Sequence, residues 1–178
     1  MRRVLFALLA GGLVLLSACS SSSTSSTATP SMTFAAAGKT VTAVPIQYCD
    51  VHEENCKANG KAPVSLTVAS GQPITVSAPK EIAQTPWQVA ARFTDAKGSQ
   101  YVSCSPLFAA GHRSVYTVHA AHAADRLVLI EVYQSSAVLV QEPNGDIDTP
   151  IRGTWVLTES TQGAKPVLPK PGDNLCSQ

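Results

Sequence analysis

The first cysteine of this chain lies in a motif that predicts a specific reaction of its thiol. Cys19 ends the motif L-S-A-C, and residues 4–16 form an uncharged, largely apolar run directly after two arginines. A short basic start, an apolar segment and small residues before a cysteine are typical of a bacterial lipoprotein signal peptide. The Cys19 thiol is then the nucleophile that takes up diacylglycerol. We expect residues 1–18 to be removed.

Two other interpretations of this segment stay open. A transmembrane anchor needs about 20 apolar residues, and this run is shorter. An ordinary secretory signal with a chance cysteine at its cleavage point is the second. We favour lipidation because the Ser-rich residues 20–26 suit a tether beyond a lipid anchor. A diacylated cysteine that carries palmitate anchors a protein stably, because two acyl chains bind the membrane firmly where a single chain binds only marginally. The predicted location is the extracytoplasmic face of the cell membrane.

Four further cysteines remain, namely Cys49, Cys56, Cys104 and Cys176. An even number outside the cytoplasm predicts two disulfides, with three connectivities open. Cys49 and Cys56 are close in sequence and flank the polar stretch D-V-H-E-E-N, so we pair them. Cys104 then pairs with Cys176 and staples the C-terminal tail to the body, with two free thiols as the alternative. A metal held by the first pair and His52 is disfavoured, because a disulfide removes the thiolates.

Histidine and acidic clusters give a weaker signal. His119 and His122 have the spacing of a metal pair, and His112 and Asp125 are near in sequence. Zinc usually needs three or four ligands, and a loop constrains spacing little, so we predict solvated histidines and no metal. Residues 144–148 superficially resemble a calcium loop but lack its closing glutamate, so we predict a hairpin turn there.

No catalytic constellation stands out. The sequence has no Gly-x-Ser-x-Gly elbow, and residues 103–106 lie near His112 in a way that chance explains. Glu131 interrupts an apolar strand, and its place in the alternation predicts a solvated, outward side chain. The other acidic candidates form no pair of defined geometry: Glu81, Asp95 and Asp148. We predict a protein that is not an enzyme and binds no cofactor.

Charge and length narrow the class of protein. Loss of Arg2 and Arg3 with the signal peptide lowers Lys+Arg from 13 to 11, against 12 Asp+Glu, so the mature chain carries a charge near −1. No cluster of basic residues is present, which argues against nucleic acid as a partner. About 160 residues remain, which suits one domain with tails.

Strand-like alternation dominates after residue 32, while helical periodicity is nearly absent. Residues 19–31 are almost all Ser, Thr and Ala and predict a flexible tether. An all-β, immunoglobulin-like two-sheet β-sandwich over 32–160 follows, with Trp87 and Trp155 in its core and an extended Pro/Gly-rich tail over 161–178. A small barrel is the alternative. The expected strands are residues 33–36, 39–47, 64–68, 74–76, 87–93, 100–104, 115–119, 127–133, 137–141 and 151–157.

Three stretches carry a family resemblance: A-P-K-E-I-A-Q-T-P-W-Q-V (residues 78–89), Y-C-D…N-C before it and G-T-W-V-L (153–157) at the end. Residues 32–157 resemble actinobacterial envelope lipoproteins, found in mycobacteria and rhodococci, that share a domain of unknown function. The resemblance implies an envelope lipoprotein with no known activity or catalytic residue to transfer. Cys104 and Cys176 lie outside the shared pattern, which favours their pairing with each other.

We therefore expect a non-catalytic module that binds or assembles unknown envelope proteins and is held to the membrane through Cys19. The alternative is a carrier of a small apolar ligand or lipid, with a cavity between the sheets. Such a cavity would be lined by Val89, Leu129 and Trp155, and the small Ala91 and Ala137 would leave room for it.

Overall fold

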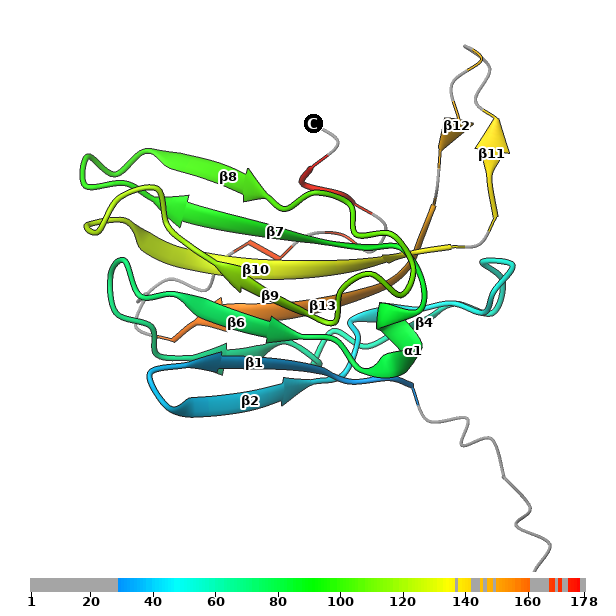
Figure 1. The fold of residues 1–178 in the computed structure, drawn as a ribbon, viewed down its shortest axis with the longest axis horizontal. Coiled ribbons are helices and arrows are strands. Elements are labelled where there is room, and N and C mark those ends of the chain that lie inside the picture. The colour runs from blue at the N-terminus through cyan, green and yellow to red at the C-terminus, as the bar shows by residue number, and fades with distance from the viewer. Residues whose placement is uncertain are drawn as a thin grey trace, which may run out of the picture.

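The computed structural model of this chain describes residues 29–136, 138–141, 145, 147–148, 150–160, 167–168, 170 and 173–176. The predicted signal peptide, Cys19 and most of the predicted tether lie outside these residues, as do Ala137 and parts of the 144–148 turn. The described chain is a two-layer β-sandwich, which confirms the predicted fold class (Figure 1). Its only helix is one short turn, so no described helix is long enough to cross a membrane.

The smaller sheet is antiparallel and has the strand order β2-β1-β6-β9. β1 and β2 form a hairpin in which Phe34 lies opposite Val41, and β6 places Val76 on the other side of Phe34. This alternation buries every second residue of β1 and β6 against the other sheet. The bounds are β1 (Met32–Ala36), β2 (Lys39–Ala43), β6 (Ile74–Ser77) and β9 (Val115–Val118).

The larger sheet has the order β4-β3-β13-β10-β7-β8, and β5 (Val64–Leu66) pairs in parallel with β13. Its central strand β10 is buried on both faces, as its nearly continuous apolar sequence predicts. The strand orders give no support to the finer expectation of an immunoglobulin-like arrangement, which is not confirmed. The bounds are β3 (Gln47–Tyr48), β4 (Lys57–Ala58), β7 (Trp87–Thr94), β8 (Gln100–Cys104), β10 (Arg126–Ser135) and β13 (Ile151–Glu159).

Three smaller features complete the described fold. α1 (Lys80–Ala83) is a single turn that follows Pro79 and joins β6 to β7. β11 (Val140–Gln141) and β12 (Ile147–Asp148) form a hairpin with Gly145 at positive φ in its connection, so the predicted turn is present but residues 147–148 form its second strand. In the turn after β7 the Asp95 carboxylate accepts the amides of Lys97 and Ser99.

Both tryptophans lie in the core between the sheets, as predicted. Each is fully buried, and each indole N–H reaches a backbone carbonyl at 3.0 Å: Trp87 donates to Arg113 O and Trp155 to Pro30 O. A buried indole N–H without such an acceptor would be costly. The Trp155 bond therefore ties the start of the described chain to the last strand of the large sheet.

Two environments differ from the expectation. Leu129 does not face the core that holds Val89 and Trp155, because it packs on the opposite face of the large sheet. Glu131 does point away from that core, but its exposed fraction is 0%, so the predicted solvation is wrong. Alternation along β10, with Ile130 and Val132 in the core, turns Leu129 and Glu131 to the outer face, and the C-terminal segment buries that face.

Candidate functional site

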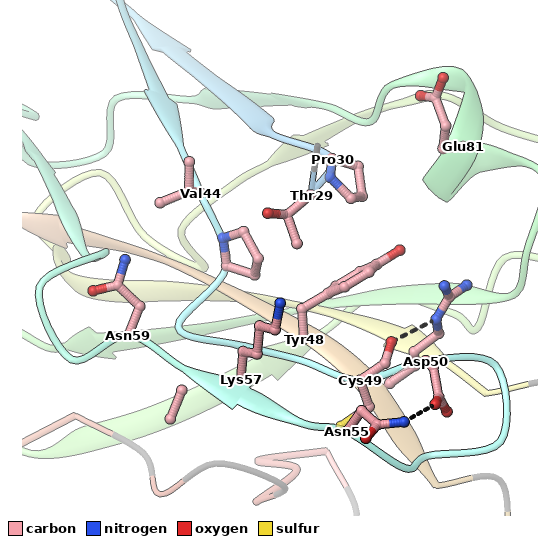
Figure 2. A pocket seen from close by; sticks show the side chains of 13 residues that line it. Thr29, Pro30, Val44, Tyr48, Cys49, Asp50, Asn55, Lys57, Asn59 and Glu81 are labelled. Carbon is pink, nitrogen blue, oxygen red and sulfur yellow. Dashed lines mark hydrogen bonds between the residues drawn. The ribbon is translucent and has the colours of Figure 1, made fainter. Parts of the chain in front are cut away.

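A surface hollow lies where the β3–β4 hairpin, the start of β1 and α1 meet (Figure 2). Its volume is about 860 Å³, which falls within the range of small-ligand pockets. Backbone and side chains from segments far apart in sequence line it. They are Thr29, Pro30, Val44, Pro45, Tyr48, Cys49, Asp50, Asn55, Lys57, Ala58, Asn59, Glu81 and Arg152.

Tyr48 and Arg152 form one wall of this hollow. The Arg152 guanidinium lies 4.8 Å from the centre of the Tyr48 ring, a cation–π arrangement. Its Nε donates to Cys49 O at 3.0 Å, while Cys49 N donates to Arg152 O at 2.8 Å. Tyr48 also meets Trp155 edge to face at 5.9 Å. These contacts hold the wall in place before any ligand arrives.

The Tyr48 phenol stays neutral at physiological pH. Partial burial is the largest influence and raises the Tyr48 pKa, Arg152 opposes it, and Glu81 adds to the rise. Arg152 thus contributes a positive charge beside a neutral aromatic ring. No hydrogen bond or ion pair joins the Lys57 ammonium group to any other residue that the structure describes, so this exposed cation is free to meet a ligand.

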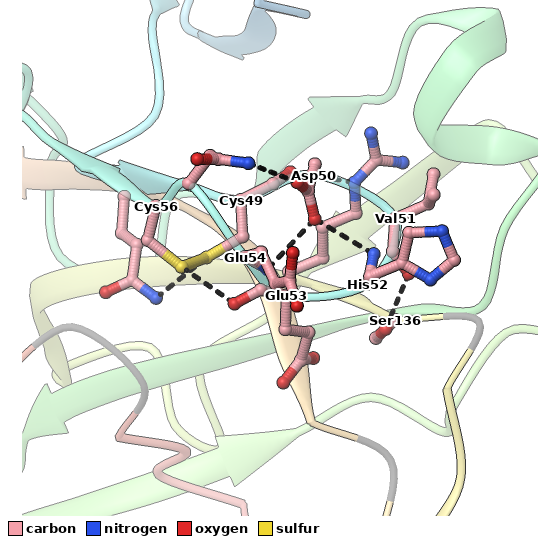
Figure 3. The surroundings of a disulfide bond; sticks show 11 residues. Cys49, Asp50, Val51, His52, Glu53, Glu54, Cys56 and Ser136 are labelled. Atoms are coloured by element: carbon pink, nitrogen blue, oxygen red, sulfur yellow. Dashed lines mark hydrogen bonds between the residues drawn. A yellow bond between two sulfur atoms is a disulfide. The ribbon is translucent and has the colours of Figure 1, made fainter.

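The rim of the hollow is the loop closed by the Cys49–Cys56 disulfide (Figure 3). Asp50 organises it: one carboxylate oxygen accepts the amides of His52 and Glu54, and the other accepts the Asn55 side-chain amide at 2.9 Å. The Asn55 hydrogen bond is the main cause of the lowered Asp50 pKa. The loop is therefore ordered around an ionised Asp50.

The second predicted disulfide, Cys104–Cys176, is also present, so both pairings are confirmed. It fixes the C-terminal segment to β8, far along the chain from the hollow. Neither pair offers a thiolate while the disulfides are intact.

The predicted histidine and acidic candidates are not brought together. His112, His119 and His122 are exposed, and the described residues contain no group of three metal-binding side chains. Asp125 is 1% exposed and serves the loop itself, accepting Tyr101 Oη at 2.6 Å and the His122 amide at 2.9 Å.

The remaining candidates have separate places in the fold. Ser105 accepts the Val89 amide and donates to Pro106 O, so its hydroxyl braces the loop after β8. Glu81 lines the hollow from α1. Asp95 holds the turn between β7 and β8, and the Asp148 side chain lies outside the described residues.

Sequence reasoning did not single out Tyr48, Lys57 or Arg152. Tyr48 adjoins Cys49 in the Y-C-D stretch, which is a weak local signal. Arg152 lies 103 residues beyond Cys49, and only the pairing of β3 with β13 brings them together. The hollow thus offers two cations, two carboxylates, an aromatic ring and amides, which are groups for reversible recognition.

Comparison with protein families gives one finding. A family model described as "Protein of unknown function (DUF2771)" matches residues 25–160, which include every described strand from β1 to β13. Comparison with curated proteins and with solved structures returns no match.

Proposed function

We propose, from the premise that this chain belongs to the DUF2771 family of unknown function, that it is a lipid-anchored envelope module that binds other proteins without catalysis. In this proposal Cys19 carries the lipid on the extracytoplasmic face of an actinobacterial membrane. The hollow beside the Cys49–Cys56 loop receives a segment of the partner. The observation that carries the proposal is this braced hollow, whose lining combines apolar and aromatic groups with charges of both signs.

Rigidity of the hollow supports a binding role. The disulfide, the Asp50 hydrogen bonds and the Arg152–Cys49 pair fix the rim and wall. Binding to a preorganised surface costs less conformational entropy than binding to one that must order itself. Aromatic and arginine side chains are also enriched among the residues that dominate protein interfaces. Tyr48 and Arg152 are one such pair.

The position of the hollow also suits an anchored protein. Thr29 and Pro30, where the described chain begins, contribute to its lining. A dozen-residue Ser/Thr-rich tether has a root-mean-square reach of roughly 20 Å. The proposed binding surface therefore stays near the membrane, where other envelope proteins are anchored.

A carrier function draws less support. The lining expected for an internal cavity divides between two faces of the large sheet, with Val89 and Trp155 in the core and Leu129 outside it. The hollow beside Tyr48 lies at the surface. We therefore retain protein binding as the proposed function.

The test compares two exposed lysines at opposite ends of the sandwich. Lys57 lies on β4 at the hollow, and Lys97 lies in the turn between β7 and β8 (Figure 1). Each is replaced in turn by a photoreactive lysine analogue in the full-length chain, and intact cells are illuminated. We expect discrete crosslinked proteins from position 57 that are absent from position 97. The same set of abundant proteins from both positions would overturn the proposal.

A second variant separates recognition from crowding near the membrane. Arg152→Ala removes the cation that lies over Tyr48 while leaving the lysine analogue at position 57. The position-57 crosslinks should weaken in this variant if the hollow recognises its partner. Unchanged crosslinking in a variant that still folds would mean that the hollow does not recognise the crosslinked protein.

A further inference from the structure

A transverse row of residues on the outer face of the large sheet leads from a disulfide to a buried acid. Cys104 on β8 lies opposite Ala90 on β7, Ala90 opposite Glu131 on β10, and Glu131 opposite Val156 on β13. The disulfide partner of Cys104 is Cys176 in the C-terminal segment. The disulfide therefore holds that segment at one end of the row in which Glu131 lies.

Residues 173–176 lie over this row. Leu175 is 9% exposed and packs with Ala90, Val128, Leu129 and Tyr133. Its amide donates to Tyr133 Oη at 3.0 Å, and Tyr133 Oη in turn donates to Glu131 Oε2. The segment is thus joined to the sheet by one disulfide, one buried leucine and a two-step chain of hydrogen bonds.

Glu131 is a titratable group that lies beneath residues 173–176. It is fully buried, and its Oε1 has no hydrogen-bond partner among the described residues. Burial is the main cause that raises its pKa to about 8; Arg92 on β7 opposes the rise and Asp173 on the covering segment adds to it. The directly facing residues, Ala90 and Val156, are apolar. Ionisation of Glu131 in this apolar site therefore carries a desolvation cost, which exposure of the carboxylate to water would relieve.

We infer that residues 173–176 form an opening cover on the outer face of the large sheet, released by ionisation of Glu131 or by reduction of the Cys104–Cys176 disulfide. The reductant in this step is a dithiol. The dithiol delivers two electrons and two protons to the S–S bond, leaves thiols at Cys104 and Cys176, and becomes a disulfide itself. Cys104 is exposed, so such a reagent can reach the bond.

Opening changes what the molecule presents to its surroundings. The closed cover hides apolar side chains of Val128, Leu129 and Tyr133 together with one carboxyl group. This surface is distinct from the hollow at Tyr48, so the inference goes beyond the proposed binding function. Its control by protons and thiols would couple an outer surface of the protein to conditions outside the cytoplasm.

Hydrogen–deuterium exchange of the full-length oxidised chain tests the inference, because the Leu175 amide donates one of the hydrogen bonds that hold the cover to the sheet. Uptake by the peptide that contains Leu175 is corrected for the intrinsic effect of pH. We expect corrected uptake to rise roughly tenfold or more between about pH 6 and pH 9, since each unit of pKa shift is worth a factor of ten. A peptide from β7 should show no such rise.

Matched variants identify the group responsible. Glu131→Gln keeps the side-chain shape and removes the titration, so the corrected pH effect should disappear. Glu81→Gln, at an acid remote from the cover, should keep it. Reduction with dithiothreitol at about pH 8, followed by exchange at about pH 6, should also speed exchange at Leu175 while β7 stays protected.

Two results would overturn the inference. One is a Leu175 amide that stays equally protected at both pH values and after reduction. The other is loss of protection at Leu175 and β7 together, which would show global unfolding instead of a local opening. Cys176→Ser provides a check that leaves Glu131 unchanged: its Leu175 peptide should exchange faster than in the parent chain while β7 remains protected.

Discussion

Glu131 gives the protein a buried acid whose energetic effect depends on pH. A carboxyl with a higher pKa in the folded chain than in the unfolded chain binds its proton more tightly when folded. Its ordinary pKa of 4.5 rises to about 8 through burial. The contribution of this proton to stability is therefore fully present below about pH 4.5, declines as pH rises, and is lost above about pH 8.

We predict that the free energy of unfolding falls between about pH 5 and pH 8 because of Glu131. The fall should be at most about 1.4 kcal/mol per pH unit, and opening of the 173–176 cover would reduce it. Urea unfolding at several pH values measures this slope. Glu131→Gln should flatten it and Glu81→Gln should not. Equal slopes for the parent chain and Glu131→Gln would contradict the prediction.

Arg152 is a second single residue with a measurable effect. Its guanidinium lies over Tyr48 and its Nε bonds Cys49 O. We predict that Arg152→Ala destabilises the fold by about 1–2 kcal/mol, the combined size of one cation–π contact and one hydrogen bond. Urea unfolding measures the loss. The exposed Arg126 at the start of β10 serves as the control, and an equal loss in Arg126→Ala would show that the Tyr48 wall contributes nothing specific.

At the scale of elements, local patterns predicted the strands well. Alternation assigned Trp87, Val89 and Phe93 to one face of β7, and they share the inter-sheet core. The turn after β7 has a local signal of the same kind, with Asp95 as the hydrogen-bond acceptor and Gly98 at positive φ. Strand alternation and turn residues depend on neighbours within a few positions, so they can be predicted from a single sequence.

Contacts between distant segments could not be predicted in the same way. The parallel pairing of β5 with β13 and the pairing of the two-residue strand β3 with β13 depend on partners far along the chain. Alternation correctly turned Glu131 away from the core, but what covers it lies 42 residues beyond Tyr133. The hollow was missed for the same reason, because Arg152 reaches Tyr48 only through sheet pairing.

Two glycines in turns test how closely the elements pack. Gly71 and Gly98 both have positive φ, at 67° and 89°. A Cβ on Gly71 would lie 2.6 Å from the Ala123 carbonyl oxygen, whereas a Cβ on Gly98 meets nothing within 4 Å. Gly98→Ala should therefore cost about 1 kcal/mol from backbone strain alone, and Gly71→Ala should cost at least about 1 kcal/mol more.

The comparison of these two variants by urea unfolding isolates the packing contribution. Gly71 also donates its amide to Asp125 O, which joins the turn before β6 to the turn before β10. The Ala123 backbone cannot move away from the added Cβ, which explains why Gly71→Ala should lose more stability than Gly98→Ala. Equal losses in Gly71→Ala and Gly98→Ala would show that the two turns can separate at no cost.

At the scale of the whole molecule, the proposed binding surface and the proposed cover lie on different parts of the sandwich. The hollow includes Thr29 and Pro30, and Trp155 holds Pro30 to the last strand of the large sheet. The cover is fixed through Cys104 at the opposite edge strand, β8. A lipid on Cys19 would therefore restrain the hollow more closely than the cover, and a partner at the membrane would meet the hollow first.

The anchor itself gives the last prediction. If Cys19 carries the lipid, Cys19→Ser should move the protein from the membrane fraction to the soluble fraction of its own cells, because no acyl chain is then attached. Ser20→Ala leaves the thiol in place and should remain with the membrane. Crosslinks from position 57 should also fall in Cys19→Ser, since the hollow is no longer held near anchored partners. Retention of Cys19→Ser in the membrane fraction would refute the lipid anchor, while loss of anchoring with unchanged crosslinks would place the partner away from the membrane.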